Sequence, residues 1–276
     1  MSLHPLWVDT DNALGSKIGD IDDAVAIIAL LKSSTPILAF SNIFGNTFQK
    51  VSFNQTQHLL QLMNCNLPQY AGANTWWDKS SQASDELSNI KTPIRILALG
   101  PLTNISLALK KNPDLKNYIS EIIFVGTNIN RQFPTWRFFD FNIFKDKSAA
   151  QHVFSCQIPI TLIPCDQARK LRLSYDEIKS TAGPEGNFLV EKSKRWFVRA
   201  RFLKLQRSVP IWDLLAVLYI LHPDQFKFVP VKVNKNLFNY VHVTRAKESH
   251  LKSISSFSTV LKQRALDLLS QPIQKF

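Results

Sequence analysis

Short apolar runs typical of buried strands alternate with helix-like periodic segments along most of the chain, and this alternation constrains the fold more than any other feature. Repeated strand–helix–strand order is typical of βαβ units, which form a mostly parallel sheet with helices on both faces. We therefore predict an α/β protein of this Rossmann-like kind. The strand-like runs span residues 5–8, 37–44, 94–99, 122–125 and 158–164, and the helix-like segments span residues 22–32, 48–64, 102–111 and 147–155.

The second half of the chain continues without a clear domain boundary. Helical segments are predicted near residues 186–207, 212–221 and 253–270, and strand-like pieces near 226–233 and 237–244 are expected to extend the sheet. The one marked break, Thr181–Gly186, is too short for a domain linker, and no internal repeat is present. Because 276 residues can bury one sizeable core, we predict a single domain over residues 1–276.

Basic residues are concentrated in the later part of the chain. The formal net charge is +12, but residues 1–100 hold 6 Lys+Arg against 8 acids. The densest basic stretch, Lys192 to Arg207, interleaves cations with apolar side chains at roughly helical spacing. This pattern allows a nucleic-acid or membrane-surface role, but it is more typical of a surface helix with a buried apolar stripe. Since no nucleic-acid motif accompanies it, we do not expect a nucleic-acid partner.

Three further features of the sequence indicate the cellular location of the protein. No run of 18 apolar residues is present, so we expect no membrane span, and the N-terminus shows no signal-peptide pattern. The three cysteines, Cys65, Cys156 and Cys165, show no paired spacing, which favours a reducing cytoplasmic location.

The residues that follow the predicted strands point to the kind of ligand. In open α/β sheets, ligands bind at the carboxyl ends of the strands. Those positions here are acidic, amidic or hydroxylic, which suits a cation or a polyhydroxyl ligand better than a phosphate chain. They are Asp9-Thr10-Asp11, Gly45-Asn46, Gly100 to Asn104, Gly126-Thr127 and Asp166.

Five aspartates lie within residues 9–23, at the end of the first strand and the start of the first helix. Helix capping, for example by Asp20, explains one or two of them. The whole set would repel itself without a bound cation, and hard oxygen ligands select Ca²⁺ or Mg²⁺. A polarised water beside a spare carboxylate is a hydrolytic nucleophile, so the cluster predicts a metal-assisted hydrolase. The five are Asp9, Asp11, Asp20, Asp22 and Asp23.

The aspartates belong to a longer series of segments, and this series resembles the nucleoside hydrolase family, also called inosine-uridine preferring nucleoside N-ribohydrolases. That family opens with a strand and DxDxGxDDxxA; this chain has DTD (9–11), the insertion NALGSKIG (12–19) and DIDDA (20–24). The later matches follow in the family's order. They are FGNT (44–47), YAGA (70–73), ALGPLTNISLAL (98–109), FDFNIFKDKSAA (139–150) and IWDLLAVLYILHP (211–223).

The resemblance implies Ca²⁺-dependent hydrolysis of the N-glycosidic bond of ribonucleosides to free base and ribose. It implies that the ion binds the carboxylates of Asp11, Asp23 and Asp213 and the main-chain carbonyl of Thr103. Asp11 would also be the general base. The alternatives are that Asp213 caps a helix and that Thr103 is an ordinary helix-start residue.

The resemblance further implies a set of side chains that hold the ribose hydroxyls. These are Asp22, Asn46 and Asn142, with Asp140 where the family usually has glutamate. Asp9 would support the cluster from behind. The alternative for Asn46 is a turn residue after Gly45.

Aromatic residues suggest a preference for purines. Many family members have a histidine directly before the last metal-binding aspartate, whereas this chain has Trp212. That tryptophan resembles the purine-specific branch, in which tryptophans stack on the base; the alternative is a buried aromatic at the start of a helix. Trp76 and Trp77, in the loop after YAGA, are predicted to supply a second stacking face, with packing of the loop as the alternative.

Several positions depart from the family pattern. The insertion at 12–19 has the composition of a surface loop. Pro134 stands where a Gly-Asn pair is usual, Thr127 replaces the second Gly of MGG, and the family's Thr-His after Asp166 is absent here. These departures concern the substrate more than the metal.

Two other functions stay open. Asp9-Thr10-Asp11 also resembles the nucleophile motif of haloacid dehalogenase-type phosphatases, although no later strand ends in paired aspartates. A non-catalytic relative that binds nucleoside or nucleic acid through the basic half is the second alternative. A homo-oligomer, either a dimer or a tetramer, is compatible with all of these interpretations.

Overall fold

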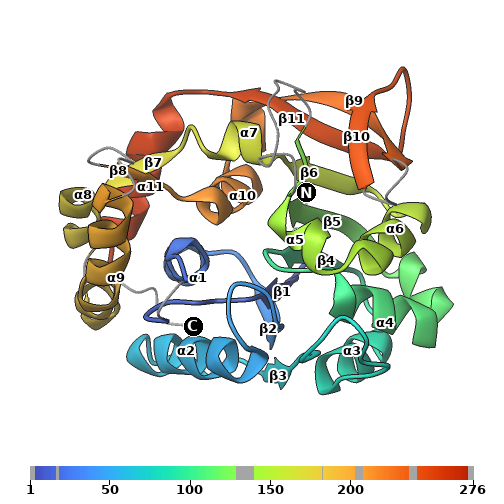
Figure 1. Cartoon of the computed structure of the whole chain (residues 1–276), viewed down its shortest axis with the longest axis horizontal. Coiled ribbons are helices and arrows are strands. Elements are labelled where there is room, and N and C mark those ends of the chain that lie inside the picture. Colours follow the sequence, from blue (N-terminus) through green and yellow to red (C-terminus); the bar gives the residue numbers. More distant parts are fainter. Residues whose placement is uncertain are drawn as a thin grey trace.

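The computed structural model describes residues 4–16, 19–128, 140–181, 183–202, 208–235 and 241–272. Within these residues, nine strands form one sheet in the order β10-β9-β11-β6-β5-β4-β1-β2-β3, flanked by helices (Figure 1). The seven strands from β11 to β3 are parallel, and β9 pairs antiparallel with both β11 and β10. The strands are β1 Leu6–Thr10, β2 Ile37–Asn42, β3 Gln69–Ala71, β4 Ile94–Ala98, β5 Ile119–Val125, β6 Ile160–Ile163, β9 Phe226–Lys235, β10 Val241–Arg245 and β11 Leu251–Phe257.

Helices cover both faces of this sheet (Figure 1). Two buried apolar clusters, one on each face, join the helices to the strands. One face carries α1 Asp22–Lys32, α2 Gln49–Leu62, α9 Pro184–Phe202, α10 Trp212–Leu221 and α11 Val260–Ser270, and the other carries α3 Gln82–Ser88, α4 Thr103–Lys111 and α6 Lys147–Ser155. Short elements complete the connections: η1 Pro113–Asn117, α5 Phe141–Lys145, α7 Cys165–Ala168, β7 Arg172–Ser174, α8 Tyr175–Lys179, β8 Ser208–Pro210 and η3 Pro223–Gln225.

Helix α1 is buried along its whole length, as expected for a helix that is apolar on all sides. At its end, the side chain of Lys32 is fully buried beside the equally buried Glu185 of α9, with 3.1 Å between Nζ and Oε1. The same ammonium donates to the carbonyl of Leu269 in α11, at 2.7 Å. One buried cation therefore joins three helices.

The predicted α/β fold with a mostly parallel sheet is confirmed. Residues 226–233 extend the sheet as expected, in β9, and the described part of 237–244 belongs to β10. The helix predicted for 253–270 is wrong in its first part, because residues Leu251–Phe257 form β11, and only Val260–Ser270 is helical. Pairing with β6 on one side and β9 on the other decides this segment, and such context overrides local preference.

The prediction that residues 12–19 form a surface loop is wrong at its beginning. Asn12, Ala13 and Leu14 are buried, and Leu14 belongs to the apolar core. The Asn12 side chain accepts from the amide of Leu14 and donates to the hydroxyl of Thr56 on α2, at 3.2 and 3.3 Å. Among its other described residues, Gly15 is exposed and Ser16 and Gly19 are half-buried; residues 17–18 lie outside the described part.

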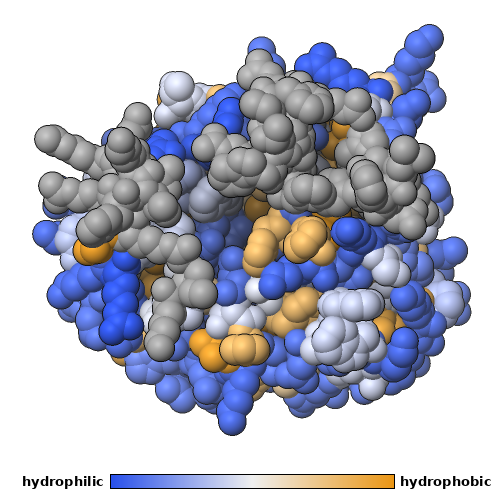
Figure 2. All heavy atoms as spheres, viewed as in Figure 1, coloured by the Kyte–Doolittle hydropathy of each residue, from blue (hydrophilic) through white to orange (hydrophobic). Residues whose placement is uncertain are grey.

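The basic helix α9 is a surface helix with a buried apolar stripe, as the spacing of its apolar residues predicts. Leu189 and Ser193 are buried and Trp196 packs against the core, whereas Lys194 and Arg195 are exposed. The side chains of residues 199–207 lie outside the described part. Figure 2 shows the face seen in Figure 1, with hydrophilic residues over most of its described part and small apolar patches. No helix among the described residues has the length and apolar character needed to cross a membrane.

Candidate functional site

A cavity of about 460 Å³ lies at the carboxyl ends of the central strands, beside the beginnings of α1 and α10. This is the crevice where ligands bind in open α/β sheets. The lining is dominated by carboxylates and amides, with one tryptophan. It consists of Asp20, Asp22, Asn46, Leu99, Val125, Asn128, Asp140, Phe141, Asn142, Cys165, Asp166, Arg169, Trp212 and Asp213.

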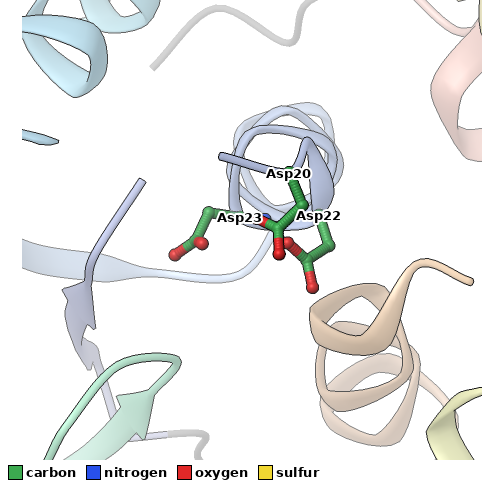
Figure 3. A group of neighbouring side chains, drawn as sticks. All are labelled: Asp20, Asp22 and Asp23. Atoms are coloured by element: carbon green, nitrogen blue, oxygen red, sulfur yellow. The ribbon is translucent and has the colours of Figure 1, made fainter. Parts of the chain in front are cut away.

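The structure brings together the carboxylates expected at one edge of the sheet. Asp20, Asp22 and Asp23 leave the beginning of α1 side by side (Figure 3), with carboxylate oxygens within 4.8 Å of one another. Burial and then the charges of Asp23, Asp11 and Asp20 raise the pKa of Asp213 well above its usual value. The α10 carboxylate is therefore electrostatically part of the cluster.

Asp11 is fully buried, and a hydrogen bond holds one of its two carboxylate oxygens in place. The main-chain amide of Asn46 donates to its Oδ2 at 2.6 Å. A Cβ at Gly45 would lie only 1.9 Å from the same oxygen, so glycine is required at this close approach. The sequence suggested that Asp20 caps α1, but the cap residue is Ile21, whose side chain makes no cap bond. Asp20 instead accepts from the side-chain amide of Asn46.

Three buried oxygens of the five-aspartate cluster have no hydrogen-bond donor among the described residues, namely Asp9 Oδ2, Asp11 Oδ1 and Asp23 Oδ2. The other oxygen of Asp23 accepts from the hydroxyl of Thr10. Burial, aided by neighbouring carboxylates, raises the pKa of Asp11 well above its usual value and that of Asp23 to about 7. Unpaired buried charge is costly, and a hard divalent cation would supply the missing partner. The residues present therefore fit such an ion.

Asp9 supports the cluster from behind and, like Asp11 and Asp23, does not line the cavity. Its Oδ1 accepts from the hydroxyl of Ser41 and from the amide of Asn104, the latter at 2.8 Å. Burial raises the pKa of Asp9 to about 7 in spite of these two bonds. This position suits the supporting role expected for it.

The capping alternative for Asp213 does not hold, because α10 has Ile211 at its cap and no side-chain cap bond. Thr103 begins α4, and its hydroxyl donates to Asp146 at 2.7 Å. Its side chain lines a different cavity, whereas its segment approaches Asp11 at Gly100, where a Cβ would lie 3.2 Å from the Asp11 Cβ.

The other side of the cavity carries the side chains expected to hold a sugar. Asn142 donates to the carbonyls of Leu99 and Val125, at 2.7 and 3.0 Å, which fixes its amide across two strand ends. The Oδ1 of Asp140 accepts from the amide of Ile143, and the thiol of Cys165 donates to its Oδ2 at 3.1 Å. Burial raises the pKa of Asp140, while burial and then Asp140 itself raise that of Cys165.

The backbone at Thr127 has a left-handed φ of 79°, which is rare for a β-branched residue. This is the position where the family pattern has glycine. The carbonyl of Thr127 accepts from the amide of Cys165 at 3.0 Å, and its own amide supports the Asp140 carboxylate. The strained residue thus connects the ends of β5 and β6 below the cavity.

The three tryptophans do not gather around one ligand site. Trp212 lines the cavity described above, whereas Trp76 and Trp77 line a separate cavity of about 540 Å³ that also contains Thr103. Both are 59% exposed, and their rings contact each other edge to face. The stacking role expected for Trp76 and Trp77, with packing of the loop as the alternative, therefore stays a prediction.

The sequence assigned no site role to six residues that line the cavity: Leu99, Val125, Asn128, Phe141, Cys165 and Arg169. Arg169 is the one cation among the described lining residues. Arg169 follows β6 by a few residues, and this position after a strand is the sequence feature that could have predicted it as a site residue. It was missed because the residues directly after the strands include no cation.

The family model for inosine-uridine preferring nucleoside hydrolases matches residues 6–250. Together with the strand-end cavity and its carboxylates, this match shows that the chain belongs to the nucleoside hydrolase family. The match covers most of the chain and includes every residue of the cavity.

Individual relatives agree with this assignment. The chain is 26% identical over 258 residues to the non-specific ribonucleoside hydrolase RihC of Escherichia coli (strain K12 / DH10B), with 82% of each chain covered. Among solved structures, a purine-preferring ribonucleoside hydrolase from Gardnerella vaginalis superposes with a TM-score of 0.81 at 17% identity, covering 96% of this chain and 99% of that one. An inosine-guanosine nucleoside hydrolase gives a TM-score of 0.79 at 18% identity, with 98% of each chain covered. At these identities the two structures demonstrate the shared fold.

Proposed function

We propose that this protein is a Ca²⁺-dependent nucleoside N-ribohydrolase that favours purine nucleosides. The observation that carries the proposal is the buried carboxylate cluster, in which three oxygens have no donor among the described residues, located next to a cavity lined by amides, carboxylates and Trp212. Hard oxygen ligands favour Ca²⁺ or Mg²⁺, and the family resemblance favours Ca²⁺.

The ion would be held by the carboxylates of Asp11, Asp23 and Asp213, with the carbonyl of Thr103 as a further ligand. When bound, it would neutralise the cluster and polarise the attacking water. Asp11 would accept the proton of that water, since one of its oxygens already accepts from Asn46 and the other is unpaired. A carboxylate in this position acts as a general base.

The ribose would be oriented by Asp22 and Asn46 on one side of the cavity and by Asp140 and Asn142 on the other. All four line the cavity, and hydrogen bonds within the protein fix three of them: Asn46, Asp140 and Asn142. Fixed carboxylates around the sugar favour the positive charge that develops as the glycosidic bond breaks.

Chelation is the direct test of the proposal. Dialysis against a chelator is expected to abolish release of reducing sugar from inosine, adenosine and guanosine, and added Ca²⁺ is expected to restore it better than Zn²⁺. The same sample should unfold at a lower temperature without the ion, because a ligand that binds only the folded state stabilises it. Full activity in excess chelator would contradict the metal dependence. Nucleoside binding without hydrolysis under any metal would favour the non-catalytic alternative.

Trp212 tests the purine preference. Trp212→Ala should lower kcat/KM for inosine and guanosine by about tenfold to a hundredfold, because aromatic stacking on a base contributes about 1–3 kcal/mol. Uridine should be affected less, and Trp212→Phe should retain most of the purine activity. Trp76→Ala is the matched control, since Trp76 lies on the separate cavity. Equal losses for purine and pyrimidine substrates would refute stacking at Trp212.

Arg169 is the candidate for stabilising the departing base, which carries negative charge as the bond breaks. Arg169→Gln should lower kcat on inosine by about a hundredfold, the size typical of removing one electrostatic donor from a transition state. A riboside with 4-nitrophenolate as leaving group needs no such help and should react at nearly the unchanged rate. The neighbouring exposed Lys170→Gln serves as control. Equal losses on both substrates would remove Arg169 from this role.

A further inference from the structure

The thiol of Cys165 contacts the carboxylate of Asp140 in the wall of the strand-end cavity. Both residues line this cavity, Cys165 at the start of α7 and Asp140 directly before α5. The Sγ atom of Cys165 lies 3.1 Å from the Oδ2 atom of Asp140, and the thiol is the donor. The family resemblance gives Cys165 no role, so this contact needs an explanation of its own.

The carboxylate of Asp140 is held at both of its oxygens. Its Oδ1 accepts from the amide of Ile143 at 2.8 Å, a bond that caps α5, and its Oδ2 accepts from Cys165. The amide bond alone would leave the carboxylate free to turn, and the thiol bond at the other oxygen removes that freedom. Each oxygen of an ionised carboxylate can accept more than one hydrogen bond, so this hold leaves acceptor capacity for a ligand.

Cys165 is itself fixed in place. Its main-chain amide donates to the carbonyl of Thr127 at 3.0 Å, which anchors it beside the end of β5. Burial and then the charge of Asp140 raise the pKa of its thiol well above the usual value. The sulfur therefore keeps its proton at neutral pH, and it donates to Asp140 instead of repelling it as a thiolate would.

We propose that Cys165 is a positioning residue that holds the Asp140 carboxylate in the orientation in which it binds a sugar hydroxyl. This role rests on the proposed function, because it assigns Asp140 to the ribose. Asp140 stands where the family usually has the longer glutamate. A shorter side chain has less freedom to adjust toward a ligand, so its orientation has to be set in advance by a neighbour.

Substitutions at Cys165 separate positioning from packing. Cys165→Ala removes the donor and should lower kcat/KM for inosine by about tenfold, since a hydrogen bond to a charged group is lost. Cys165→Ser retains a donor and should stay within about threefold of the wild type. A packing role alone would make the two variants equal. Cys156→Ala is the matched control: its half-buried thiol donates to the carbonyl of His152, and its loss should not change turnover.

A double-mutant cycle shows whether Cys165 acts through Asp140. Asp140→Asn keeps an oxygen for the Ile143 amide, and with it the cap of α5, while it removes the charge. In that background, Cys165→Ala should lower kcat/KM by less than about twofold further, because the group that it positions is already lost. The same tenfold loss in both backgrounds would exclude the positioning role, as would equal rates for Cys165→Ser and Cys165→Ala.

Turnover by the wild type reports separately on the proposed function. If the wild type releases no ribose from inosine with Ca²⁺ present, the proposed hydrolysis fails, and calorimetric titration of the same variants with inosine decides the role of Cys165. Cys165→Ala should then bind inosine about tenfold more weakly than both the wild type and Cys165→Ser. Equal affinities of the wild type and Cys165→Ala would exclude the positioning role.

Discussion

Replacing Asp11 with alanine is expected to lower kcat for nucleoside hydrolysis by about 10²–10⁴-fold, the range for loss of a general base. The loss should fall at the upper end, because Asp11 is also a proposed ligand of the ion. Its carboxylate is completely buried, accepts from the Asn46 amide at 2.6 Å and has an unpaired second oxygen. Steady-state release of reducing sugar from inosine at saturating Ca²⁺ measures the effect.

The same substitution should leave the fold intact. Removing one carboxylate from a cluster of mutually repelling groups relieves charge repulsion, so in chelator the Asp11→Ala unfolding temperature should not fall below that of the wild type. The exposed Asp114→Ala is the matched control and should change neither activity nor stability. An unchanged turnover rate in Asp11→Ala would sink the proposed mechanism.

The second large effect concerns stability alone. Lys32→Met should lower the free energy of unfolding by about 3–5 kcal/mol, because it leaves Glu185 as an uncompensated buried charge. It also removes the donor to the Leu269 carbonyl, so α1, α9 and α11 lose a common contact. Urea denaturation followed by circular dichroism measures the change.

Two comparison variants separate the buried charge from simple loss of contacts. The double variant Lys32→Met/Glu185→Leu removes both charges and should recover most of the lost stability. Lys262→Met breaks the half-exposed pair with Glu177 and should cost no more than about 1 kcal/mol. If Lys32→Met behaves like Lys262→Met, the ion pair does not hold these helices together.

The sequence predicted the site best where polar residues directly follow the strands of the parallel sheet. The alternation of strands and helices predicts the parallel sheet, and the strand ends predict which residues meet. Asp22, Asn46, Asp140, Asn142, Trp212 and Asp213 all line one cavity as expected. These residues converge because parallel strands bring their carboxyl ends to a single edge, whatever the details of side-chain packing.

The remaining features depend on contacts that no local pattern encodes. The strand at Leu251–Phe257 exists because β6 and β9 flank it on both sides. Trp76 and Trp77 follow a site motif in sequence, yet their loop places them on a different cavity. Arg169 comes after a strand end by several residues, and only the turn of α7 brings it back toward the cavity.

The insertion at 12–19 is joined to the core at its beginning, which limits where this loop can be altered. Its first residues belong to the core, with Leu14 fully covered and Asn12 bonded to α2. Directly after the insertion, Asp20 accepts from the side-chain amide of Asn46. Deleting residues 12–14 would therefore remove core contacts and the bond to α2, whereas an added residue is best placed beside the exposed Gly15.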